Sequence, residues 1–133
     1  MSEAIKVEIV SPEHLVFSGA VKSVSVPGVE GYFTVMGTHA PLMSILKPGF
    51  VSVESEKEAT SFYVGGGFAD VSDSGVTILA EEAKTASDFE PSQIDDAIKQ
   101  AEGLLAGAET PEAKNSAQAL LDGWKNLALE AKD

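Results

Sequence analysis

The spacing of the apolar residues changes about two-thirds of the way along the chain, and this change limits the possible folds more than any other feature. From Lys6 to Ala83, apolar and polar residues alternate in bursts such as "IKVEIV", "VKSVSV" and "VTILAE". Alternation with period two, rich in β-branched residues, is typical of strands. Turn signals such as "SPE", "KPG" and "SDSG" separate the bursts. Residues 1–86 are therefore predicted to form a β-sandwich, a flattened barrel of about ten short strands.

The rest of the chain has the period of a helix. Pro91 suits the first position of a helix, and Gly107 suits its end. Thr110 is a candidate N-cap for a second helix, with Pro111 in its first turn. The second apolar stripe consists of Ala113, Ala117, Leu120, Leu121, Trp124, Leu127 and Ala128. Two such stripes joined by a short loop predict an antiparallel two-helix hairpin over residues 87–133.

Composition and charge exclude several classes of function. Hydrophobic residues make up 44% of the chain and charged residues 23%, as in soluble globular proteins. The 21 acidic residues outnumber nine lysines, the chain has no arginine, and the net charge is −12. Arginine is the usual donor to phosphates and base edges, and an acidic surface repels polyanions. No apolar run approaches the roughly 20 residues of a membrane span. Nucleic-acid binding and direct membrane insertion are therefore not expected.

The chain has no cysteine, which excludes disulfides, thiolate nucleophiles and iron–sulfur ligation. The first residues, "MSEAIKVEIVSPEH", lack the basic start and apolar core of a signal peptide. They are also too acidic for an organelle transit peptide. These features favour a cytoplasmic location.

The remaining polar residues form no recognisable reaction centre. His14 and His39 lie 25 positions apart, without the spacing of a metal site. "GGGF" at 65–68 lacks the Lys and Ser/Thr of a phosphate-binding loop, and glycines within a strand indicate a bulge or the close approach of another backbone. We therefore expect no catalytic residue, no metal and no cofactor.

Adjacent acidic residues and the single tryptophan also have simple structural interpretations. Glu81–Glu82 and Asp95–Asp96 are neighbours in sequence, so their side chains diverge on a strand or a helix. We interpret them as solvated acidic faces. Trp124 falls on the apolar stripe of the second predicted helix, so a packing role is favoured over stacking with a nucleobase.

The stretch "GVEGYFTVMGTHAPLMSILKPG", residues 28–49, is the most unusual part of the chain. It reads as a long apolar loop shaped by glycines and prolines, which suits a contact with another protein. Two other classes stay open at this point. A small enzyme or ligand-binding sandwich would need a pocket with converging polar groups, and an adaptor would use the hairpin as a mobile arm.

Three blocks of the sequence resemble a known family. "FSGAVKSVSVPGVEGYFTVMGTHAPLMSILKPG" (17–49), "YVGGGFADV" (63–71) and "VTILAEEA" (76–83) resemble the ε subunit of the F-type ATP synthase in content, order and spacing. The resemblance implies a non-catalytic rotor subunit of a proton-translocating enzyme. The absence of a transit sequence favours a bacterial member, peripheral on the cytoplasmic face of the inner membrane.

The resemblance also implies partners and contact residues. In this family the sandwich docks on the γ subunit of the central stalk, and its lower edge meets the polar loops of the membrane c-ring. The counterpart segments here are "GVEG" and "THAPL". The implied contact residues are Glu30, Gly31, His39, Ala40, Pro41 and Leu42.

The family's hairpin is a regulatory element that can extend to the catalytic β subunit and brake ATP hydrolysis. Some members bind ATP through an Ile/Leu-Asp-x-x-Arg-Ala segment; here Ile94 and Asp95 match, but Ile98 replaces the arginine and Lys99 the alanine. Little or no ATP binding is expected without the guanidinium. Residues 112–133 carry three lysines against four acids, so we expect feeble or no inhibition through the β subunit.

Overall fold

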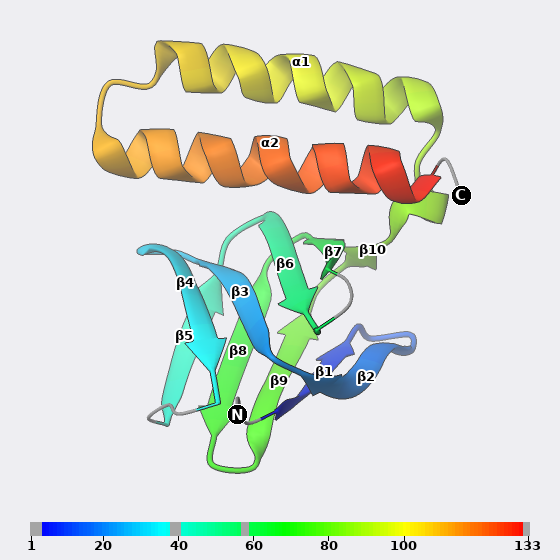
Figure 1. The fold of residues 1–133 in the computed structure, drawn as a ribbon, viewed down its shortest axis with the longest axis vertical. Coiled ribbons are helices and arrows are strands. Elements are labelled where there is room, and N and C mark those ends of the chain that lie inside the picture. The colour runs from blue at the N-terminus through cyan, green and yellow to red at the C-terminus, as the bar shows by residue number, and fades with distance from the viewer. Residues whose placement is uncertain (1–3, 38–40, 57–58, 132–133) are drawn as a thin grey trace.

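The computed structural model describes residues 4–37, 41–56 and 59–131. Figure 1 shows a sandwich of strands with a pair of antiparallel helices lying along one end of it. This arrangement confirms the predicted fold class, a β-sandwich followed by a two-helix hairpin. No helix in these described ranges is long and apolar enough to cross a membrane.

Ten strands lie within the described ranges, and nearly all neighbouring strands are antiparallel. The exception is β1 with β9, which pair in parallel. The strands are β1 (Ile5–Val10), β2 (Leu15–Val21), β3 (Ser23–Gly28), β4 (Gly31–Met36), β5 (Leu42–Leu46), β6 (Gly49–Glu54), β7 (Ala59–Val64), β8 (Gly67–Ser72), β9 (Gly75–Ala80) and β10 (Ala83–Lys84).

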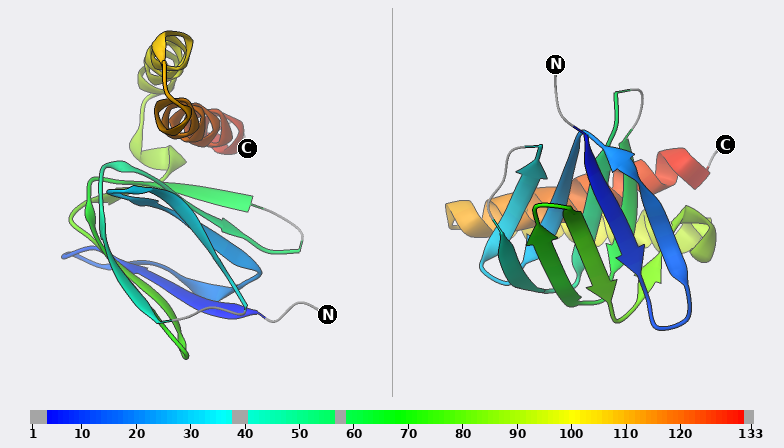
Figure 2. Two further views of the ribbon diagram at one scale, coloured as in Figure 1. Left: turned by 90° about the vertical axis from the view of Figure 1, so that its left-hand side faces the viewer. Right: turned by 90° about the horizontal axis from the view of Figure 1, so that it is seen from below.

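The strand order divides the sandwich into two layers. One layer, which we call the hairpin sheet, contains β10, β7, β6, β3 and β4. The other, which we call the open sheet, contains β5, β8, β9, β1 and β2. The two meet where Gly28 of β3 pairs with Leu46 of β5. Figure 2 shows the layers facing each other, with the helices outside them.

The main core fills the space between the two sheets. Strand alternation sends every second side chain inward, and these inward positions are mainly valine and isoleucine, whose branched side chains pack well on a pleated surface. Fully buried members are Val7, Ile9, Val24, Val26, Val51, Val64 and Ile78. The predicted alternation therefore corresponds to a real inner face on both sheets.

The two helices begin where the sequence predicts. Helix α1 (Pro91–Gly107) starts at its proline, and α2 (Pro111–Ala131) follows after a short loop. The Ala113 N–H donates to Thr110 Oγ1 at 3.1 Å, which confirms the predicted N-cap. Helix α2 packs on β4, β6 and β7, whereas α1 packs mainly on α2.

An aromatic cluster joins the hairpin to the sandwich. The Trp124 ring lies 5.1 Å from the rings of both Phe50 and Phe89, and 5.4 Å from that of Tyr63, measured between ring centroids. A side chain at Gly123 would run into the Phe50 ring, so glycine allows α2 to lie directly against that ring. The predicted packing role of Trp124 is confirmed, and Phe50 is 1% exposed beneath it.

The glycine-rich run "YVGGGFADV" does not form one continuous strand. Strand β7 ends at Val64 and β8 begins at Gly67, so the chain crosses here from the hairpin sheet to the open sheet. Gly66 and Gly67 have φ angles of 112° and 140°, which favour glycine. A Cβ on Gly67 would collide with the Leu79 carbonyl oxygen. The predicted close approach of another backbone is therefore confirmed.

The glycines and prolines of the stretch 28–49 suggest one long loop, and this prediction is wrong. The stretch contains β4 and β5, which belong to different sheets. Backbone pairing with β3 and β8 outweighs the turn-forming composition of the stretch.

Candidate functional site

The first predicted contact segment is the two-residue turn between β3 and β4. Val29 is 51% exposed and Glu30 is also exposed at the tip. Gly31 has a φ of 136°, which favours glycine at the start of β4. The Val29 N–H donates to the Ile45 carbonyl at 3.0 Å, which fastens the turn to β5. The turn therefore presents a carboxylate on a well-supported protrusion.

The described part of the second predicted segment, Pro41 and Leu42, leads into β5. Pro41 is exposed, and Leu42, 49% exposed, pairs with Val71 at the start of β5. His39 and Ala40 lie outside the described residues. Gly28, beside the turn, pairs with Leu46, and Leu42 lies four residues away along β5, about 13 Å at the usual rise of a strand. The described contact residues thus form two separate patches and not one.

The outer face of the open sheet carries large exposed apolar side chains. Ile45 is 57% exposed, Phe68 48% and Leu79 50%. The strand register places Ile45 opposite Phe68, Phe68 opposite Leu79, and Leu79 opposite Val10. These four residues form a row across β5, β8, β9 and β1, which we call the apolar stripe. Met43, 68% exposed, extends it on β5.

The contact residues predicted from the sequence do not include the apolar stripe, although the sequence of β5 indicates a contact surface. In "LMSIL" of β5, apolar residues occupy both the inward and the outward positions. A strand exposed to water on one face normally alternates apolar and polar residues. Apolar residues at both inward and outward positions therefore indicate that the outer face of β5 is also a contact surface.

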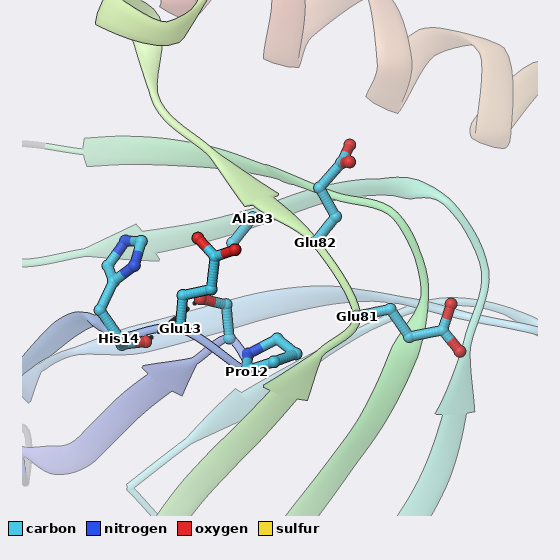
Figure 3. A pocket seen from close by; sticks show the side chains of 7 residues that line it. Pro12, Glu13, His14, Glu81, Glu82 and Ala83 are labelled. Carbon is cyan, nitrogen blue, oxygen red and sulfur yellow. Dashed lines mark hydrogen bonds between the residues drawn. The ribbon is translucent and has the colours of Figure 1, made fainter.

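One depression lies on the apolar stripe, and a second adjoins the first. The first, about 330 Å³, is lined in part by Val10, Pro12, Phe68, Leu79 and Glu81. The second, about 230 Å³, shares Pro12 and Glu81 with the first and includes Glu13, His14 and Glu82. Figure 3 shows Glu13 and His14 on the turn after β1, near the segment that follows β9.

The carboxylates of the second depression do not converge on one point. Figure 3 shows Glu81 and Glu82 pointing in different directions, as expected for sequence neighbours. Glu82 forms an ion pair with Lys84 at 3.7 Å. No group of three metal-ligating side chains occurs among the residues that the structure describes. The arrangement supplies negative charge beside an apolar surface, and not an acid–base pair.

One ionisable group connects the β3–β4 turn with the hairpin. The Tyr32 hydroxyl accepts a hydrogen bond from the Phe50 N–H at 3.1 Å. Burial raises the pKa of Tyr32 above its usual 10.0; the hydrogen bond lowers it and nearby Tyr63 adds to the rise. The Lys47 ammonium lies 5.8 Å from the Tyr32 ring centroid and 3.2 Å from Ser116 Oγ of α2.

Of the four helix positions aligned with the nucleotide-binding segment, the two isoleucines serve packing here. Ile94 is 2% exposed. Ile98, in the position of the arginine, packs against the cluster around Phe50. Asp95 and Lys99 are exposed. The place of the phosphate donor is therefore taken by an apolar side chain that faces the hairpin interior.

Comparisons with known proteins identify the family. A family model described as the ATP synthase delta/epsilon chain β-sandwich domain matches residues 4–86. The ATP synthase epsilon chains of Brucella canis and Brucella anthropi are each 40% identical to this chain over 122 residues. These alignments cover 91% of this chain and 90% of each relative.

Two solved structures share the fold. One is a chain of the Euglena gracilis mitochondrial ATP synthase assembly of OSCP, F1 and c-ring, with a TM-score of 0.63 and 22% identity, covering 98% of this chain and 81% of that one. The other belongs to the central stalk and c-ring of the Tetrahymena thermophila enzyme, with a TM-score of 0.53, 13% identity and 95% coverage of both chains. This chain therefore belongs to the delta/epsilon family of ATP synthase subunits, whose epsilon chains are non-catalytic subunits of the central stalk.

Proposed function

We propose that the chain is a rotor subunit of a bacterial proton-translocating F-type ATP synthase, bound peripherally on the cytoplasmic face of the inner membrane. It carries torque between the c-ring and the γ subunit and breaks no bond itself. The observation that carries this proposal is the 40% identity with Brucella epsilon chains across 91% of the chain. The apolar stripe supports it, because an exposed apolar surface marks a site of protein association.

The two separate patches favour two different partners. Leu42 begins β5 opposite Val71, on the inner side of the strand, whereas Met43 and Ile45 of the same strand carry the outer apolar surface. An apolar surface suits a lasting contact, and we assign it to the γ subunit. The turn with Glu30 and Gly31 is polar and protruding, and we assign it to the polar loops of the c-ring.

The hairpin remains on the sandwich and does not act as a strong brake. An extended hairpin that reached the β subunit would uncover Phe50, Tyr63 and Trp124, which now bury one another. It would also break the hydrogen bond between Asn126 and Ser61, at 3.2 Å. Loss of this apolar contact opposes extension, and the weak net charge of α2 offers little in return.

Reconstitution tests the proposed function. ATP synthase prepared without this chain is expected to hydrolyse ATP with poor proton pumping, and addition of the purified chain is expected to restore pumping. Turnover and pumping are measured on the same vesicles. If the chain does not bind the depleted enzyme and pumping is complete without it, the proposal is wrong.

A further inference from the structure

The apolar stripe lies between carboxylates on both of its sides. The next row of outward residues lies on the side away from the hairpin. Across β5, β8, β9 and β1 it consists of Met43, Asp70, Thr77 and Glu8, each opposite the next. Asp70 is exposed and Glu8 is half-buried. The sheet geometry therefore sets two acidic side chains beside Phe68 and Leu79, on the same outer face.

Further carboxylates border the opposite side of the stripe. Glu81 lines the depression that contains Phe68 and Leu79, and it also lines the neighbouring depression with Glu13 and Glu82. All three are exposed. Lys84, the cation bound to Glu82, also lies 5.4 Å from the Phe89 ring and is part of the hairpin contact. Glu13 and Glu81 form no ion pair with any residue that the structure describes.

We propose that this surface recognises an amphipathic segment of the γ subunit that places an apolar ridge on the stripe and lysine or arginine side chains on both sides of it. This inference rests on the proposed function, and it adds the charge pattern of the partner. Acidic rows on both sides of an apolar centre attract cations and repel other anionic surfaces. The carboxylates thus select the partner and fix its register, while the stripe holds it.

Two other occupants fit the charges less well. A second copy of this chain would bring the same acidic rows and a net charge of −12 to the contact. Anionic lipid headgroups would meet the same repulsion. A basic amphipathic segment avoids this charge repulsion, and its apolar side covers the stripe.

Two matched triple variants test the proposal with the full-length chain and the purified γ subunit of the same enzyme. The first, Glu13→Gln with Asp70→Asn and Glu81→Gln, removes three charges from the border of the stripe. The second, Glu54→Gln with Asp96→Asn and Glu102→Gln, removes the same three charges at exposed sites elsewhere. We expect the first to weaken binding about tenfold at low salt and to flatten its salt dependence, because local charge complementarity acts mainly on association. The second is expected to change binding much less.

Leu79→Gln, with Leu104→Gln as its control, separates this proposal from the proposed function. Leu79 is 50% exposed on the stripe and Leu104 is 59% exposed on α1. If Leu79→Gln weakens binding but the two triple variants behave alike, the charge pattern is wrong and the docking face stands. If Leu79→Gln binds as well as Leu104→Gln, the docking face itself is wrong. Self-association of the wild-type chain that Leu79→Gln abolishes would assign the stripe to a second copy and overturn the inference.

Discussion

The two sheets of the sandwich carry similar apolar residues on their outer surfaces, but only one is covered by the chain itself. On the hairpin sheet, Phe50 lies opposite Tyr63, and Trp124 of α2 packs against both. On the open sheet, Phe68 lies opposite Leu79, and each remains about half exposed. The hairpin thus covers one outer face of the fold, and the proposal assigns a stalk partner to the other, which stays exposed in the chain alone.

Removal of the hairpin is expected to have the largest effect on this comparison. A chain without residues 88–133 exposes Phe50 and Tyr63, so both sheets become uncovered and the sandwich loses stability. Chemical denaturation measures the loss. In assembled enzyme that retains the shortened chain, we expect ATP hydrolysis to change little, because we propose that the hairpin is not a strong brake. A large rise in hydrolysis would contradict this part of the proposal.

Gly123→Ala is expected to loosen the packing of α2 on the hairpin sheet without detaching the helix. The added methyl group would collide with the buried Phe50 ring, and such overpacking costs about 2 kcal/mol of unfolding free energy. The same substitution at Gly103, where nothing lies within 4 Å of the new atom, serves as the control. Gly103→Ala should gain up to about 1 kcal/mol from helix propensity. Equal effects at the two glycines would show that α2 is not closely packed on Phe50.

Tyr32→Phe tests the link between the β3–β4 turn and the covered face. Loss of the hydroxyl leaves the Phe50 N–H without its acceptor and should cost about 1 kcal/mol at neutral pH. Because burial raises the folded-state pKa above 10.0, the unfolded tyrosine ionises first as pH rises. Wild-type stability contributed by this group is therefore complete below pH 10.0 and declines above it. Denaturation curves of the variant should show a smaller alkaline decline.

Glu30→Gln is expected to have the smallest effect on stability and a measurable effect on function. The residue is exposed at the tip of its turn, so unfolding free energy should shift by no more than about 0.5 kcal/mol. Proton pumping driven by ATP should weaken if the turn contacts the c-ring. His39→Gln applies the same test to the segment outside the described residues. Unfolding of the Glu30 variant would instead assign this residue to the fold.

The sequence predicts the architecture well because local signals and burial agree. Alternating valines in β3 and β6 mark the inner face, and Thr110 and Pro111 mark the start of α2. The separation of Glu30 from Leu42 is not predictable, since both lie in a stretch whose glycines and prolines resemble one loop. Strand pairing sets Gly28, beside the turn, against Leu46 and leaves Leu42 at the far end of β5, and pairing depends on contacts distant in sequence.

Thiol labelling shows whether a stalk partner covers the open sheet. The chain has no cysteine, so Leu79→Cys and Leu104→Cys each introduce a single reactive site, at residues 50% and 59% exposed. Labelling rates are compared for the free chain and for the chain assembled in ATP synthase. We expect assembly to protect the thiol at position 79 and to leave the one at position 104 reactive. An unchanged labelling rate at position 79 after assembly would contradict this expectation.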